Sequence, residues 1–221
     1  LQVQFGRVGE VRPAAAPIGT RIQVADLFGE LPARRKFLKR DATERAHCVS
    51  WVERLALAHI GIGFRVFHEG KVLLDIAPEE DLLARCAAIF GRGIADAMVQ
   101  AQVITDLVTM EALIGPPESA RRGTARTHVF LNGRWVRDPR LMRALREGLR
   151  EFVPGGQLPP VVLSLAVPPD RVDVNVHPQK TEVRLRDERL VVSTIIRALR
   201  AGLARSPWAT RSVGPVGSSR E

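Results

Sequence analysis

Hydrophobic and polar residues alternate most clearly in residues 172–185, which read VDVNVHPQKTEVRL. A repeat of two is typical of a half-buried strand, in which successive side chains point to opposite faces. Pro178 interrupts the repeat because it has no backbone N–H to give to a sheet. The pattern therefore predicts two strands joined by a bend that carries Lys180, whose ammonium suits a phosphate. A solvated loop lysine is the alternative that these residues leave open.

A second clear pattern predicts a hairpin followed by a helix. Asn132-Gly133 lies between two apolar runs, which is the strongest short signal for a hairpin. Asp138 then precedes Pro139, a pair suited to the cap and first position of a helix. The predicted helix has apolar residues on one face, namely Leu141, Leu145, Leu149 and Phe152.

Weaker patterns fill in the rest of the chain. Strands are expected at residues 21–25, 108–112 and 161–167, and a hairpin at 64–76. Helices are expected from Pro32, over 41–59 with Asp41 as cap, over 78–90, and from a cap at Asp187. The helix at 41–59 would turn Val49, Val52, Leu55 and His59 inward. Residues 92–101 fit either a helix or a strand, and 115–123 read as a mobile basic loop.

The composition indicates a folded chain of one or two domains. It has 221 residues, of which 45% are hydrophobic, and no apolar run approaches the roughly 20 residues that span a membrane. No membrane partner and a cytoplasmic (bacterial, nucleoid-associated) location are expected. Cys48 and Cys86 lack the spacing of metal ligands, so no metal site is expected. The chain opens on Leu1 in a strand-like run, and we expect a fragment whose N-terminus lies upstream.

The net charge of +9, from 33 Lys and Arg against 24 Asp and Glu, favours a polyanionic partner. At about 100° per residue, basic side chains gather on the helix face opposite the leucines. Such a stripe could neutralise DNA phosphates without reading bases, and a solvated helix face is the alternative. The predicted DNA-binding residues are Arg134, Arg137, Arg140, Arg143, Arg146 and Arg150.

Three stretches resemble motifs of the MutL-type DNA mismatch repair proteins. Residues 172–185 resemble DVNVHPxKxEVRF, with Leu185 in place of the final aromatic residue. Residues 19–38, GTRIQVADLFGELPARRKFL, resemble GTxVxVxDLFxNxPARxKFL, with Glu30 where the family more often has Asn. Residues 128–139 are similar to xFVNGRxVxD.

The resemblance implies an α/β (α+β) fold in two parts. Residues 1–91 would be the C-terminal part of a GHKL-type ATPase domain. Residues 92–204 would form a small transducer domain similar to a ribosomal-protein-like βαβ fold. Residues 205–221 would be a disordered tail.

The resemblance also implies an ATP-switched, sequence-independent DNA-binding coordinator of mismatch repair. Lys180 would contact the ATP γ-phosphate, and Gly19 and Thr20 would lie beside the adenine pocket. The intact protein would be a slow Mg²⁺-dependent ATPase. The family's catalytic Glu, its Mg²⁺-binding Asn and its Gly-rich lid do not occur in this sequence, so this chain alone is expected to be inactive and to bind neither ATP nor Mg²⁺.

The implied partners are DNA, a mismatch-recognition protein of the MutS type, a downstream nuclease or helicase, and a second copy in a homodimer. Two other interpretations stay open. One is a stand-alone nucleic-acid-binding α/β module, which would have no reason to carry Gly19-Thr20. The other is a gyrase-like GHKL topoisomerase subunit, a family with Gln-Thr-Lys where this chain has His-Pro-Gln-Lys.

Overall fold

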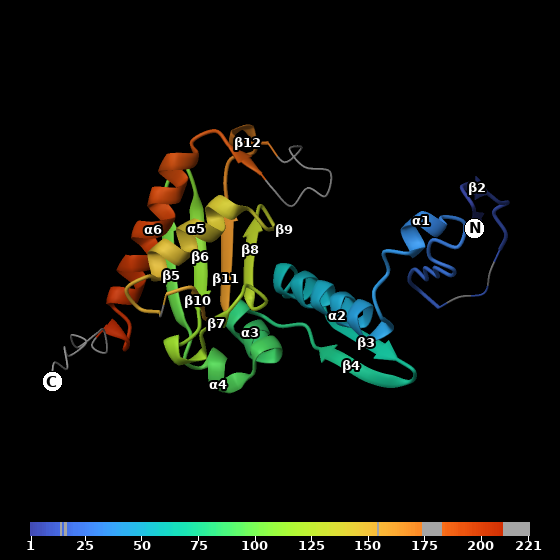
Figure 1. The fold of residues 1–221 in the computed structure, drawn as a ribbon, viewed down its shortest axis with the longest axis horizontal. Helices are drawn as coiled ribbons and strands as arrows, with labels where there is room; N and C mark the ends of the chain where they lie inside the picture. The colour runs from blue at the N-terminus through green and yellow to red at the C-terminus, as the bar shows by residue number, and fades with distance from the viewer. Residues whose placement is uncertain (14, 16, 154, 174–182, 210–221) are drawn as a thin grey trace. The chain divides into compact units, whose positions relative to one another are not determined.

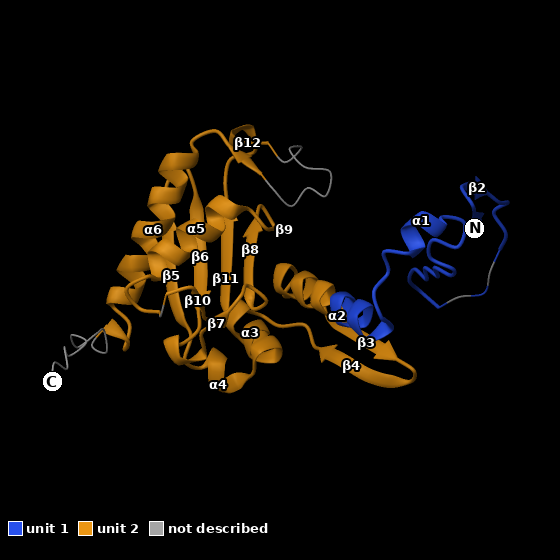
Figure 2. Ribbon diagram, viewed as in Figure 1, with its two compact units in different colours: residues 1–48 blue, residues 49–221 orange. Residues whose placement is uncertain are grey.

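The computed structural model describes residues 1–13, 15, 17–153, 155–173 and 183–209. By its internal contacts the chain forms two compact units, residues 1–48 and residues 49–221 (Figure 2). The boundary predicted at residue 91 stays a prediction.

The first unit contains little regular structure. Strands β1 (Val3–Gln4) and β2 (Arg7–Val8) pair antiparallel, and the short helix α1 (Pro32–Arg35) begins at the predicted proline. The strand predicted at residues 21–25 is absent, and its apolar side chains are exposed. A strand needs a neighbour for its backbone groups, and the described residues of this unit supply none to this segment.

Helix α2 (Asp41–Ala58) differs from the predicted helix in two respects. Asp41 is not its cap but lies in its first turn, and Glu44 reaches back to accept the backbone N–H of Lys39 at 2.8 Å. Of the residues expected to turn inward, Leu55 is 46% exposed and His59 is also exposed; the helix buries Ala56 and Leu57 instead.

The second unit is built on a five-stranded sheet (Figure 1). All neighbouring strands run antiparallel except the central β11 and β8, which are parallel. Residues 92–101 contain both candidate structures, because a short helix, α4 (Arg92–Ala95), precedes the first strand. In sheet order the strands are β5 (Val99–Ile104), β6 (Thr109–Ile114), β11 (Val161–Ala166), β8 (Thr127–Leu131) and β9 (Arg134–Val136).

Helices cover both faces of this sheet, which explains the apolar run predicted as a central strand. Val161, Leu163 and Leu165 of β11 join the larger core with helices α5 (Pro139–Leu149) and α6 (Glu188–Ala204). Val162 points to the other face, toward helix α3 (Leu82–Phe90) and Leu57 of α2.

Short elements complete the unit. The predicted hairpin forms between β3 (Phe64–His68) and β4 (Lys71–Ile76). Helix α3 begins four residues later than predicted, because Asp81 accepts the Ala84 N–H at 2.7 Å and caps it. No described helix is both long and apolar enough to cross a membrane.

The segment at residues 115–123 is not the mobile loop that was expected. It contains a 3-10 turn, η1 (Pro117–Ser119), and strand β7 (Arg121–Arg122), which pairs with β10 (Gln157–Leu158). Its buried residues include Pro116 and Ala120, so packing holds a segment whose composition suggested mobility.

The contact between α5 and α6 requires a glycine. A Cβ added to Gly148 would lie 2.6 Å from Leu199 Cδ1 and 3.0 Å from Leu199 Cβ. We therefore expect Gly148→Ala to lower the free energy of unfolding by about 1–3 kcal/mol, measured by urea denaturation. Gly93→Ala is the control, because a Cβ there meets no atom within 4 Å. Unchanged or raised stability of Gly148→Ala would contradict the close approach.

Candidate functional site

The two ends of the Lys180 segment are held together by a short ribbon. Strand β12 (Val172–Asp173) pairs antiparallel with β13 (Arg184–Leu185), with Val172 opposite Leu185. A strand on each side of the predicted bend is thus observed. Residues 174–182, with Lys180 among them, lie outside the described residues.

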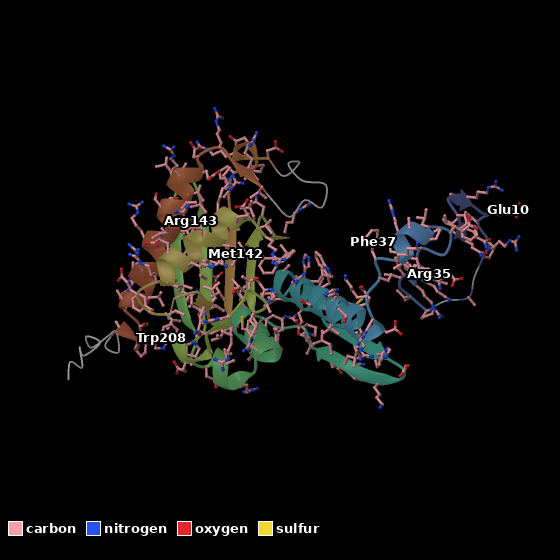
Figure 3. The ribbon with its side chains drawn as sticks, viewed as in Figure 1. Glu10, Arg35, Phe37, Met142, Arg143 and Trp208 are labelled. Atoms are coloured by element: carbon pink, nitrogen blue, oxygen red, sulfur yellow. The ribbon has the colours of Figure 1, made fainter. Side chains whose placement is uncertain are left out.

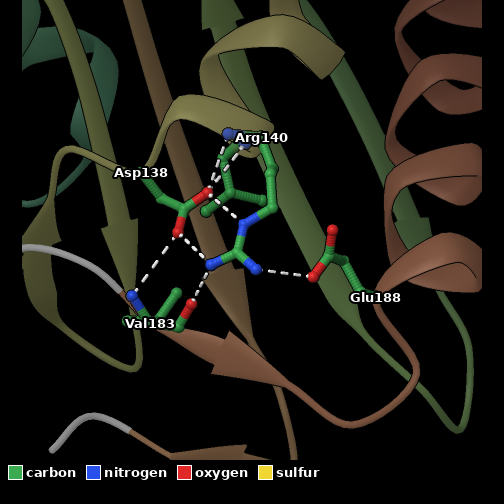
Figure 4. A network of polar contacts seen from close by, with 5 residues as sticks. Asp138, Arg140, Val183 and Glu188 are labelled. Atoms are coloured by element: carbon green, nitrogen blue, oxygen red, sulfur yellow. Dashed lines mark hydrogen bonds and ion pairs between the residues drawn. The ribbon is translucent and has the colours of Figure 1, made fainter. Parts of the chain in front are cut away.

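Asp138 lies where the Asn132-Gly133 hairpin meets helix α5. Both hairpin residues have positive φ, 49° and 75°, as the predicted turn requires. The Asp138 carboxylate accepts the backbone N–H of Arg140 at 2.8 Å and that of Leu141 at 3.3 Å, and so caps the helix as predicted. Its second oxygen accepts the backbone N–H of Val183 at 3.4 Å (Figure 4). One buried carboxylate therefore joins the start of α5 to the end of the Lys180 segment.

The Arg140 guanidinium closes this network. Its Nε and Nη2 donate to the two oxygens of Asp138 at 3.2 and 2.8 Å, and its Nη1 donates to Glu188 at 2.7 Å. Nη2 also donates to the backbone carbonyl of Val183. Burial, the largest single cause, acts to raise the pKa of Asp138, but the hydrogen bonds and charge of Arg140, together with the hydrogen bond from the Leu141 N–H, outweigh it and lower that pKa. The bond to Asp138 in turn raises the pKa of Arg140, so both groups stay charged.

A second ion pair lies beside the ribbon. Arg171 Nη1 is 2.9 Å from Asp187 Oδ2, and the Arg186 N–H donates to the Arg171 carbonyl at 3.0 Å. Asp187 occupies the N-cap position of α6, as predicted, but its side chain makes no capping hydrogen bond. The carboxylate is directed to Arg171 instead, so it joins the turn before β12 to α6.

The other predicted arginines are exposed. Arg143 and Arg146 lie on the outer face of α5, and neither forms an ion pair with another described residue. Arg143 and its buried neighbour Met142 are labelled in Figure 3. Arg150 lies 3.6 Å from Glu147. Arg134 and Arg137 are also exposed, in and just after β9.

Gly19 and Thr20 belong to the first unit. Both are exposed and lie outside any helix or strand, and Gly19 has a φ of 135°. Across the described residues there is no group of three or more His, Cys, Asp or Glu side chains that could hold a metal ion.

An aromatic cluster that the sequence did not predict lies on the face of the sheet that α3 covers, opposite α5 and α6. The Arg54 guanidinium lies 4.9 Å from the ring centre of Trp51 and 4.1 Å from that of Trp135. The two rings meet edge to face at 5.3 Å. Burial lowers the pKa of Arg54, and the nearby Arg137 lowers it further. The spacing of Trp51 and Arg54 on one helix face was a signal, but nothing in the sequence pointed to Trp135 as their partner.

His128 lies in the same layer and is 3% exposed. Its ring stacks on Phe90 with centres 6.0 Å apart, and its Nδ1 has no hydrogen-bond partner among the described residues. Burial lowers the pKa of His128 to about 4, and the charge of Arg54 acts in the same direction. The histidine is therefore held neutral.

Comparisons with known proteins identify the family of this chain. A sequence model described as "DNA mismatch repair protein, C-terminal domain" matches residues 86–204. DNA mismatch repair protein MutL of Acidiphilium cryptum is 40% identical over 92% of this chain and 35% of its own length. MutL of Neisseria meningitidis FAM18 is 38% identical over 92% of this chain and 31% of its own length.

Two solved structures have a similar fold. The N-terminal domain of a DNA repair protein has a TM-score of 0.66 and 21% identity, over 80% of this chain and 59% of that one. The Aquifex aeolicus MutL ATPase domain complexed with ADP has a TM-score of 0.52 and 24% identity, over 78% and 55%. The chain is thus a mixed α/β protein, as predicted, with a fold similar to that of these two domains.

The chain belongs to the MutL family of DNA mismatch repair proteins. It spans about a third of the length of the curated relatives it matches.

The buried histidine gives a pH dependence with a defined sign. The pKa of His128 is about 4 when folded and near 6.5 when unfolded, so between these values unfolding takes up a proton. Stability should be undiminished above pH 6.5 and fall by up to about 3 kcal/mol as the pH drops toward 4. Replacing the side chain in His128→Gln should flatten this part of the curve, measured by urea denaturation. The exposed His59→Gln is the control, and a parallel loss of stability in His128→Gln and the parent would contradict the assignment.

Proposed function

We propose that this chain is the part of a MutL-type protein that binds the DNA backbone without sequence preference. The observation that carries the proposal is the division of α5 into two faces. Leu141, Leu145 and Leu149 are at most 1% exposed, whereas Arg143, Arg146 and Arg150 are exposed on the opposite side.

The spacing of these arginines suits phosphates. Residues three or four apart on a helix are neighbours, so the three guanidinium groups form one stripe. Arginine binds phosphate through a planar fork of donors, and contacts of this kind position DNA without reading its bases. The exposed Arg134 and Arg137 add to the local positive charge.

Arg140 differs from the other five arginines predicted to bind DNA. Its guanidinium already faces two carboxylates, those of Asp138 and Glu188, at 2.8 and 2.7 Å. A phosphate would have to displace these ions, so the proposed DNA surface depends on the other five arginines.

We further propose that the whole protein uses ATP as a switch. Family membership and the sequence around Gly19, Thr20 and Lys180 support this proposal. The whole protein would then bind ATP and Mg²⁺ mainly with residues that this chain does not contain, and would hydrolyse ATP slowly. A MutS-type partner, a nuclease or helicase, and a homodimer are proposed on the same basis.

The DNA proposal is tested by the salt dependence of binding. Arg143→Glu combined with Arg146→Glu should weaken binding to any duplex sequence, because two phosphate contacts are lost. The slope of log affinity against log salt should shrink by about 0.9 per lost contact, measured by fluorescence anisotropy at several salt concentrations.

Arg34→Glu combined with Arg35→Glu is the matched control. This double variant changes the net charge by the same amount as the α5 pair, and it does so at two exposed arginines of another helix. The proposal expects the α5 pair to lose clearly more affinity than this control. Equal losses would show that only net charge matters.

The ATP proposal is tested in the full-length protein with Lys180→Ala. A lysine that stabilises charge developing on a phosphate typically contributes 10²-fold or more to kcat. We expect kcat to fall by about that factor with nucleotide affinity nearly unchanged. Lys71→Ala, an exposed lysine on β4, is the control. Unchanged turnover in Lys180→Ala would rule out the proposed contact.

A further inference from the structure

One arginine connects three segments that are far apart in the sequence. Arg140 lies in the first turn of α5, 43 residues from Val183 and 48 residues from Glu188. Its Nε, Nη1 and Nη2 each donate a hydrogen bond within this network (Figure 4). The segments it connects are the start of α5, the residue before β13, and the start of α6.

Both backbone polar groups of Val183 form hydrogen bonds in this network. Its N–H donates to Asp138, and its carbonyl accepts from Arg140. Val183 is 1% exposed, and Leu185, two residues later, is 7% exposed. The Asp138 side chain is 1% exposed, whereas the side chains of Arg140 and Glu188 are 41% and 37% exposed. Solvent therefore has little access to the hydrogen bond between Asp138 and Val183 and more access to the outer ion pair of Arg140 and Glu188.

Val183 is also the first described residue after the segment that carries Lys180. Lys180 precedes it by three residues, and three residues of chain span at most roughly 11 Å. Where Val183 is fixed therefore limits where the preceding residues can reach. At the other end, the pairing of Val172 with Leu185 provides a separate anchor.

We propose that Arg140 is a positioning residue that fixes the C-terminal end of the Lys180 segment by holding Val183. The functional part of this inference rests on the proposed role of Lys180; the holding of Val183 does not. The network also separates two roles. Asp138 caps α5 through backbone N–H groups, which remain when the Arg140 side chain is removed, so the helix keeps its cap in Arg140→Ala.

The first test needs no nucleotide. Amide hydrogen exchange, resolved by residue with NMR, should become at least tenfold faster at Val183 in Arg140→Ala. Glu188→Gln, which weakens only the outer ion pair, should give a smaller change in the same direction. Arg146→Ala is the matched control, because that arginine lies on the same helix and forms no ion pair with another described residue. Unchanged exchange at Val183 in Arg140→Ala would overturn the inference.

The second test uses ATP turnover of the full-length protein. If Arg140 acts through Lys180, Arg140→Ala should lower kcat with KM nearly unchanged, and the double variant with Lys180→Ala should be no slower than Lys180→Ala alone. Additive losses would show that Arg140 acts independently of Lys180 and would overturn its positioning role. If Lys180→Ala does not change turnover but Val183 exchange still rises, the proposed role of Lys180 fails and the holding of Val183 stands.

Discussion

The carboxylate of Asp138 is the interaction on which this part of the molecule depends. It is 1% exposed, so its charge must be balanced within the protein. The first turn of α5, the guanidinium of Arg140 and the N–H of Val183 supply that balance. Removing any of them would leave part of a buried charge unpaired, which ties the three segments to a single arrangement.

The sheet fixes the position of Asp138, so that its carboxylate can join these three segments. The Asn132-Gly133 hairpin connects β8 to β9, and the Asn132 side chain bonds both the N–H and the carbonyl of Val167 at the end of β11, at 2.8 and 2.9 Å. The hairpin is therefore fastened to the central strand. The chain then passes through β9 directly to Asp138, so the cap of α5 has a fixed position relative to the strand that leads toward β12.

Features encoded by neighbouring residues could be predicted from the sequence. The Asn132-Gly133 turn, the Asp138 cap, and the strands before and after Lys180 each depend on a few adjacent positions. The family also followed from local motifs, because three of them occur in one chain.

Features that depend on distant partners could not be predicted. Arg140 was placed in a basic stripe by its helical spacing, and nothing local showed that Glu188 and Val183 would surround it. The segment at 115–123 has the composition of a mobile loop but pairs with β10. The prediction of a strand at residues 21–25 was wrong because a strand needs a neighbouring strand to pair with, and alternation of apolar and polar residues does not show whether one is present.

The pKa of the Asp138 carboxyl group, measured by NMR titration of its ¹³C resonance, tests the central interaction most directly. The hydrogen bonds from Arg140 should hold this pKa below the ordinary 3.8 of an aspartate in spite of burial. Because burial acts in the opposite direction, a pKa at or above 3.8 would show that Arg140 does not engage the carboxylate in solution, and would contradict the role of this pair in holding the three segments together.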